Sequence, residues 1–228
     1  MLRREAEWLG TQMGALQADR LYPLVNLGSS TAQFREHDQP WIHRSLFARA
    51  RREDLVHVDL KADEGVDVVG GLDDDAVFAE LQRRAPRSVL SSNLLEHLEP
   101  ARRAVWCARM VDLVAPGGYL ILSVPRAFPY HPDPIDTGFR PGVAELAALF
   151  PTLRPLVGAE VAAGHIWALL PGNLRRLAVK SAGMALGRGD AHHASVAERA
   201  GEPSRLRDWL VPWAWRPFRV TCLVLERP

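Results

Sequence analysis

The fold is decided by residues 59–125, which read DLKADEGVDVVGGLDDDAVFAELQRRAPRSVLSSNLLEHLEPARRAVWCARMVDLVAPGGYLILSVP. Short apolar runs alternate in this stretch with segments of helical character, and polar residues follow most of the runs. Strands that alternate with helices predict a parallel sheet, and such sheets bind ligands outside the carboxyl ends of their strands. The polar residues are therefore expected at the ligand-binding edge of the sheet.

The same pattern continues on both sides of this stretch. An amphipathic helix is predicted over residues 2–18, a short buried strand over 24–27, and an apolar final strand over 218–226. The remaining predicted elements are, in chain order, a helix from 39, strands 55–59 and 66–70, a helix after 75, strand 87–91, helix 100–114, strand 119–124, and helices 142–150 and 173–186. Strand and helix thus alternate through the middle of the chain.

These elements predict an α/β fold with a doubly wound, mostly parallel, Rossmann-like sheet, an antiparallel final strand and a single domain. A length of 228 residues suits one such domain. We expect four parts: an N-terminal helix (1–20), a core (21–164), a helical insertion or lid with a mobile loop (165–210) and the strand that completes the sheet (211–228). The ligand site is expected in the core.

The balance of acidic and basic residues argues against partners that bind through a large net charge of the protein. The chain has 28 basic and 27 acidic residues and a formal net charge of +1. Such a chain does not attract nucleic acid or an anionic membrane as a whole. We therefore expect a small molecule as the partner, with no nucleic acid and no membrane contact.

Cysteine content and the first residues bear on the cellular compartment. Cys107 and Cys222 are too few for a disulfide framework and lack metal-ligand spacing, so both are predicted to be buried thiols. Acidic residues interrupt the N-terminus where a signal peptide needs an apolar core, and no stretch has the length of a membrane span. These features predict a cytoplasmic protein.

Taken in order, the motifs resemble those of the class I S-adenosylmethionine-dependent methyltransferases, in particular methyltransferase type 11, over nearly the whole chain. Residues 24–30 resemble the family's first strand and cofactor loop, Asp59 the acidic residue after strand two, and 92–100 the segment after strand four. Residues 113–124 resemble the Leu-x-Pro-Gly-Gly-x-Leu-x-Ile stretch, and 218–226 the antiparallel last strand. The resemblance implies S-adenosyl-L-methionine as the cofactor.

The resemblance also implies which residues bind this cofactor. They are Asn26, Gly28, Ser29, Ser30, Asp59, Gly71, Leu72, Asn93, Leu94 and His97. Gly28 permits a tight turn and close approach of the backbone, and Asp59 can accept hydrogen bonds from ribose hydroxyls. Gly71 and Leu72 would border the adenine, whereas Asn93 and Leu94 would face the methionine portion and the sulfonium.

The chain departs from the family pattern at the first loop. Asn26 stands where the family has an acidic residue, and Gly28 is followed by Ser29-Ser30 where the family has a Gly-x-Gly-x-Gly run. A neutral acceptor lacks the charge-assisted part of a hydrogen bond to the cofactor's amino group. This departure motivates an alternative function, a methyltransferase-like binding or scaffold protein without turnover.

Acceptor chemistry is expected in the loop 126–140, because methyltransferase substrate loops follow the fifth strand. His131 and Asp136 are the candidate catalytic bases for an acceptor that must lose a proton. Two alternatives stay open: His131, Asp133 and Asp136 can form part of an oxygen-rich metal site, or the carboxylates cap turns and one of them pairs with Arg140. We assign no metal to the chain.

The sequence therefore predicts methyl transfer to the oxygen or nitrogen of a small-molecule or sugar-type acceptor. Residues 173–186 form a cationic amphipathic stretch. The segment 165–186 that contains it can serve as a lid over the acceptor, a homodimer surface or an interfacial helix. A nicotinamide-dependent oxidoreductase is disfavoured, because the Gly-x-Gly-x-x-Gly fingerprint is absent after the first strand.

Overall fold

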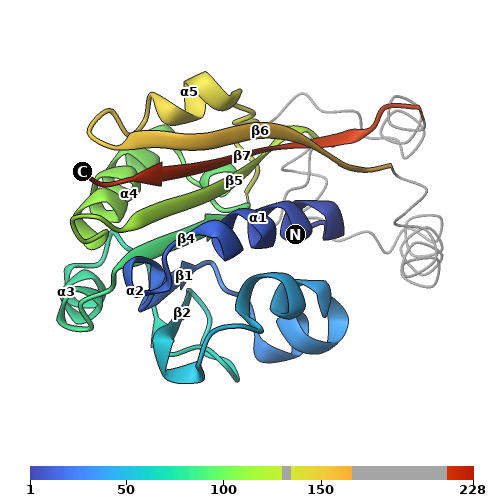
Figure 1. Cartoon of the computed structure of the whole chain (residues 1–228). Helices are drawn as coiled ribbons and strands as arrows, with labels where there is room; N and C mark the ends of the chain where they lie inside the picture. Colours follow the sequence, from blue (N-terminus) through green and yellow to red (C-terminus); the bar gives the residue numbers. More distant parts are fainter. Residues whose placement is uncertain (130–134, 166–214) are drawn as a thin grey trace, which may run out of the picture.

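A computed structural model describes residues 1–129, 135–165 and 215–228, in which seven strands form one sheet (Figure 1). The strand order is β3-β2-β1-β4-β5-β7-β6. Strands β3, β2, β1, β4 and β5 run parallel, and β7 runs antiparallel to both of its neighbours. The predicted α/β fold, with a mostly parallel sheet and an antiparallel final strand, is confirmed.

The bounds of the elements agree closely with the predicted ones at most positions. The strands are β1 (Leu24–Leu27), β2 (Leu55–Asp59), β3 (Val68–Val69), β4 (Ser88–Ser92), β5 (Tyr119–Ala127), β6 (Arg154–Gly164) and β7 (Phe218–Glu226). The α-helices are α1 (Arg3–Ala15), α2 (Ala18–Leu21), α3 (Asp75–Arg83), α4 (Pro100–Leu113) and α5 (Val143–Ala147). Short π or 3-10 turns are η1 (Phe34–Asp38), η2 (His43–Phe47), η3 (Arg52–Asp54) and η4 (Leu95–His97).

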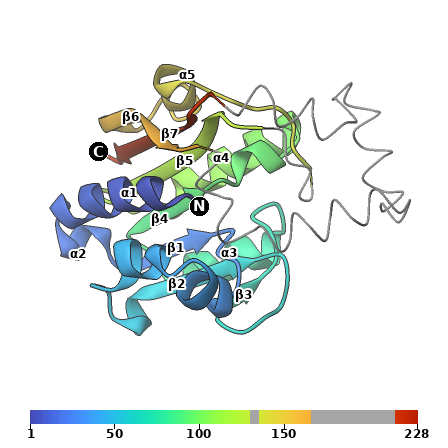
Figure 2. The ribbon, with the colours of Figure 1, turned by 90° about the vertical axis from the view of Figure 1, so that its right-hand side faces the viewer.

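Apolar side chains fill both faces of the sheet, because neighbouring residues of a strand point to opposite faces. Leu120 and Leu122 of β5 pack into the core covered by α3, α4 and α5, whereas Ile121 packs into the core covered by α1. Figure 2 shows α1 on one side of the sheet and α4 on the other. The chain thus forms three layers, and the central sheet is buried on both sides.

The N-terminal helix α1 lies close against η2. Leu9 and Met13 of α1 are buried there beside Leu46. A β-carbon on Gly10 would lie 2.3 Å from the backbone oxygen of Ser45, so only glycine permits this approach. This packing fixes α1 so that its first turn lies at the edge where the parallel strands end.

Strand β6 was not predicted from the sequence. It contains Gly158, Gly164 and a proline, which are depleted in strands, and it forms the outer edge of the sheet with most side chains at least partly exposed. Its pairing with β7 along the full length of both strands determines its conformation. A tertiary partner has therefore overridden a weak local preference.

Two further findings concern the cysteines and the helices. Cys107 and Cys222 are free and buried, as predicted, and burial raises the pKa of Cys107 to about 11. In the part of the chain that the structure describes, no helix is both long enough and apolar enough to cross a membrane.

Candidate functional site

The carboxyl ends of β1 and β2 are joined by backbone groups and by Asp59. The backbone N–H of Ser29 donates to the Val58 oxygen at 3.0 Å, and the N–H of Ser30 donates to Asp59 Oδ2 at 2.8 Å. The other oxygen, Oδ1, accepts from the N–H of Lys61 at 3.2 Å. Each carboxylate oxygen keeps a further lone pair, and Asp59 is partly exposed, so it can accept hydrogen bonds from a bound hydroxyl.

The loop after β1 also packs against the loop after β4. Gly28 is exposed and has a φ of +67°, which is the left-handed region that favours glycine. A β-carbon at Gly28 would lie 3.2 Å from Leu94 Cδ1. The structure therefore brings together two residues that the sequence predicted to share one site.

A buried arginine holds the β1 loop in place. Arg35 of η1 donates to the backbone oxygens of Ser29, at 3.1 Å, of Ser30, and of Gly65, at 2.8 Å. Burial lowers the pKa of Arg35, and its guanidinium binds two carbonyls of the β1 loop and one carbonyl of the segment between β2 and β3. Sequence reasoning missed this residue, because no local motif joins Arg35 to the loop.

Asn26, the residue in place of the family's acidic one, makes its contact inside the core. Its Nδ2 donates to Nδ1 of His57 across the β1–β2 pair at 3.1 Å, so His57 carries its own proton on Nε2. Burial lowers the pKa of His57 to about 3, with Arg35 as a second cause, so the ring is neutral at neutral pH. The Asn26–His57 contact is thus an uncharged one.

Asn93 lies at the exit of β4 and is bound on two sides. It has a φ of +49°, its N–H donates to the Ser123 oxygen at 2.9 Å, and its Nδ2 donates to Oε1 of Glu5 at 2.8 Å. Glu5, on α1, is 1% exposed. Glu5 was not predicted as a site residue, although it lies three residues after Leu2 and four before Leu9, on the apolar face of the predicted helix.

Gly71 and Leu72 follow β3 and are both buried. A β-carbon on Gly71 would lie 2.6 Å from Asp73 Oδ1 and 2.9 Å from the ring of Trp106. Asp73 accepts from Arg102 at 2.8 Å and from Trp106 Nε1 at 2.8 Å, and the Arg102 hydrogen bond lowers the pKa of Asp73. Leu72 is 0% exposed and packs in the core, so a role as an adenine wall would require this loop to open.

The loop after β5 docks on the turn after β4. Nδ1 of His97 lies 2.5 Å from the Ile135 oxygen, and the N–H of Thr137 donates to the Glu96 oxygen at 2.9 Å. His97, which was predicted to bind the cofactor, therefore contacts the loop 126–140, in which the acceptor-binding residues were expected.

Asp136 is held in a bidentate ion pair. Its two oxygens accept from Arg140 Nη1 at 3.0 Å and Nη2 at 2.5 Å, and the N–H of Gly138 adds a bond of 2.9 Å. This pairing with Arg140 is one of the alternatives raised by the sequence. His131 and Asp133 lie outside the described residues, as does nearly all of the predicted lid, 165–210.

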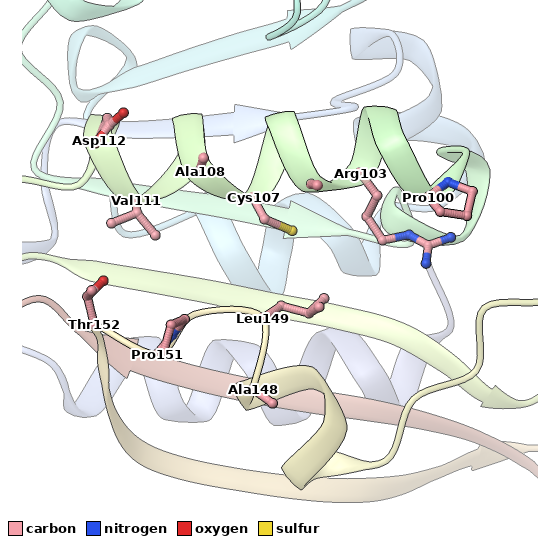
Figure 3. A pocket seen from close by; sticks show the side chains of 11 residues that line it. Pro100, Arg103, Cys107, Ala108, Val111, Asp112, Ala148, Leu149, Pro151 and Thr152 are labelled. Carbon is pink, nitrogen blue, oxygen red and sulfur yellow. The ribbon is translucent and has the colours of Figure 1, made fainter.

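Two hollows in the described surface lie away from these residues. One of about 720 Å³ runs between α4 and the α5 turn, where Arg103, Cys107 and Leu149 are among the lining residues (Figure 3). Another of about 320 Å³ is lined by residues that include Arg35 and His57. None of the predicted cofactor residues lines either of these two hollows.

Within the described ranges, 1–129, 135–165 and 215–228, no group of three or more His, Cys, Asp or Glu side chains is arranged to hold a metal ion.

Comparison with other proteins gives a likeness in structure alone. No protein-family model and no curated protein matches the chain. A methyltransferase dependent on S-adenosylmethionine from Anabaena variabilis ATCC 29413 superposes with a TM-score of 0.56, at 12% identity over 99% of this chain and 84% of that one.

Two other structures show the range of chemistry on this fold. Coclaurine N-methyltransferase, bound to N-methylheliamine and S-adenosylhomocysteine, has a TM-score of 0.50 at 12% identity over 97% of this chain and 72% of that one. The [4+2]-cyclase SpnF has a TM-score of 0.52 at 15% identity over 97% and 80%. The sheet order and these superpositions show that the chain has the fold of the class I S-adenosylmethionine-dependent methyltransferases.

Proposed function

We propose that the chain is an S-adenosylmethionine-dependent methyltransferase that acts at oxygen or nitrogen of a small-molecule or glycan-type acceptor. The observation that carries the proposal is the convergence of Gly28, Asp59 and Leu94 at one edge of the sheet, from the ends of three different strands. Ligands of open α/β sheets bind outside this edge. A cytoplasmic location and a homodimer remain part of the expectation and need separate measurement.

The residues of this edge fit a nucleoside-type cofactor. Asp59 has free lone pairs for ribose hydroxyls, and Gly28 lets the backbone approach a ligand without a side chain. Arg35 keeps the loop rigid, so little ordering is required on binding. Asp59 would hold the ribose in a fixed position, and the loop at Gly28 would hold the methionine portion.

The chain's contribution to methyl transfer would be mostly positional. The bound cofactor supplies a methyl group on a cationic sulfur, which is displaced in line by the acceptor. Holding the acceptor in line and excluding water supply much of the acceleration of such a reaction. Asp136 and His131 stay our candidates for removing an acceptor proton, and Asp136 would first have to give up part of its pairing with Arg140.

Coclaurine N-methyltransferase suggests a small amine as one acceptor class to be tested. Measurement of S-adenosylhomocysteine formation, with small amines, phenols and sugars as separate acceptor panels, tests the proposal. Turnover with one class and saturable cofactor binding are expected. Binding of a nicotinamide cofactor in preference to S-adenosylmethionine would instead support the function of a nicotinamide-dependent oxidoreductase.

The second candidate is a methyltransferase-like protein that binds ligands without methyl transfer. The uncharged Asn26–His57 contact favours it, because it places no carboxylate at the end of β1. SpnF, a [4+2]-cyclase of similar structure, shows that the fold alone does not fix methyl transfer. Tight binding of S-adenosylmethionine without turnover in any acceptor panel would favour this candidate.

A further inference from the structure

Glu5 brings a carboxylate from the N-terminal helix to the ends of two central strands. Ser92 and Asn93 lie at the end of β4, and Ser123 lies beside them on β5. All three side chains donate to Glu5 Oε1, at 3.3 Å, 2.8 Å and 2.6 Å in that order. Figure 1 shows the N-terminus of α1 over this part of the sheet. The carboxylate is therefore one hydrogen bond away from Asn93, a predicted cofactor residue.

The donors that surround Glu5 are all neutral. Besides the two serines and the asparagine, the backbone N–H of Leu2 donates to Oε2 at 2.9 Å. Within residues 1–129, 135–165 and 215–228, no basic group forms an ion pair with Glu5. The carboxylate is thus well hydrogen-bonded by neutral groups, and no cation among the described residues pairs with it.

A buried charge of this kind is costly and acts strongly on its neighbours. The cost of removing a carboxylate from water persists even after the protein around it has relaxed. Neutral donors offset part of this cost, but they leave the net charge, and water does not screen that charge well at 1% exposure. A cation that binds at the same strand ends would be stabilised by it.

The end of β1 offers no such charge. Asn26 is neutral, it is 6% exposed, and its amide nitrogen donates to His57. Asp59 is charged, but it lies one strand further from β4 in the sheet order. Asn93 Nδ2 donates to Oγ of Ser92 at 3.2 Å and to Oε1 of Glu5 at 2.8 Å, and of these two acceptors only Glu5 is a carboxylate.

We propose that Glu5 supplies the negative charge that favours a sulfonium ligand over a neutral thioether at the ends of β4 and β5. This inference rests on the proposed function, because it concerns the same cofactor edge. Glu5 acts through Asn93 and through its electric field, so it is a positioning residue. It makes no direct contact with the reacting atoms in this account.

Titration with two ligands separates the charge from the hydrogen bonds. S-adenosylmethionine and S-adenosylhomocysteine share the adenosine and amino-acid parts, and they differ in the positive charge and the methyl group at sulfur. In Glu5→Gln the affinity for S-adenosylmethionine should fall by about tenfold or more, and that for S-adenosylhomocysteine by less than about threefold. A purely structural tie between α1 and β4 would weaken both ligands by the same factor, which would overturn the proposal.

Glu7→Gln is the matched control. Glu7 lies on the same helix, is half-exposed and pairs with Arg3 at 2.8 Å, so the variant makes the same change of charge at the surface. It should leave both affinities unchanged. An equal loss of S-adenosylmethionine affinity in Glu7→Gln would show a nonspecific effect of net charge and overturn the assignment to Glu5.

The wild-type protein gives an independent measurement if Glu5→Gln does not fold. It should bind S-adenosylmethionine more tightly than S-adenosylhomocysteine, and tighter binding of the neutral thioether would overturn the proposal. Absence of binding of either ligand to the wild type would instead overturn the proposed function, and the role of Glu5 with it. The two failures are therefore distinguishable.

Discussion

Leu94 packs against the turn at Gly28, and a β-carbon on Gly28 would come within 3.2 Å of Leu94 Cδ1. Gly28 follows β1 and Leu94 follows β4, and these two strands are neighbours in the sheet. The contact joins the loops after β1 and β4 at the edge of the sheet where the cofactor is proposed to bind. A side chain at Gly28 would push these two loops apart.

Gly28→Ala is expected to weaken S-adenosylhomocysteine binding by about tenfold or more, because the variant combines a positive φ with a close contact to Leu94. Gly117→Ala is the matched control. Gly117 has a φ of +77°, but it lies before β5 at the opposite end of the sheet. Both variants should lose stability in thermal unfolding, and only Gly28→Ala should lose affinity. Equal affinity in the two variants would contradict the placement of the site.

Asp136 and Arg140 should behave as a coupled pair. Asp136→Asn and Arg140→Gln are each expected to lower the free energy of unfolding by about 3 kcal/mol, because each removes one member of a bidentate ion pair in which Asp136 is buried. The double variant should lose clearly less than the sum of the two. Urea unfolding of the four proteins measures this coupling. Strict additivity would show that the ion pair does not hold the loop.

His57 should make the fold sensitive to acid. Its pKa is lowered by burial to about 3, against 6.5 for an unperturbed histidine. The stability that the neutral ring contributes is fully present above pH 6.5 and is lost as the pH falls towards 3, because the unfolded chain takes up the proton first. Between pH 7 and pH 5 the loss should be about 2 kcal/mol.

His57→Gln tests this dependence, since the glutamine oxygen can still accept from Asn26 and does not titrate. The free energy of unfolding of the variant should fall less steeply between pH 7 and pH 5 than that of the wild type. His37→Gln, at an exposed position of η1, should keep the wild-type slope. The same slope in His57→Gln and wild type would contradict the account.

The order of the motifs predicted most of the fold, because the strands and helices of the parallel core are each marked by residues within the element itself. The strands at 24–27 and 55–59 are mostly apolar, and helix α4 begins at Pro100, as proline at the first turn predicts. The edge strand β6 was missed because its stability comes from pairing with β7, which a local pattern does not reveal.

The site residues at the strand ends could be predicted from the sequence, whereas the residues that hold them in place could not. Asp59 is the last residue of β2 and Gly28 directly follows β1, so their position in the chain predicted their position in the sheet. Arg35 and Glu5 reach the same edge from helices, and their partners lie 5 to 30 and 3 to 118 residues away in the chain. A glutamate on the apolar face of a predicted helix was the signal that could have identified Glu5.

The central claim is that Asp59 binds the ribose of S-adenosylmethionine, and calorimetric titration of the wild type and Asp59→Ala with this cofactor tests it most directly. The wild type should bind saturably, and Asp59→Ala should bind about tenfold more weakly or worse, because hydrogen bonds to a carboxylate are lost. Asp63→Ala, which removes an exposed carboxylate from the same loop, should bind like the wild type. Unchanged affinity in a folded Asp59→Ala protein would contradict the account.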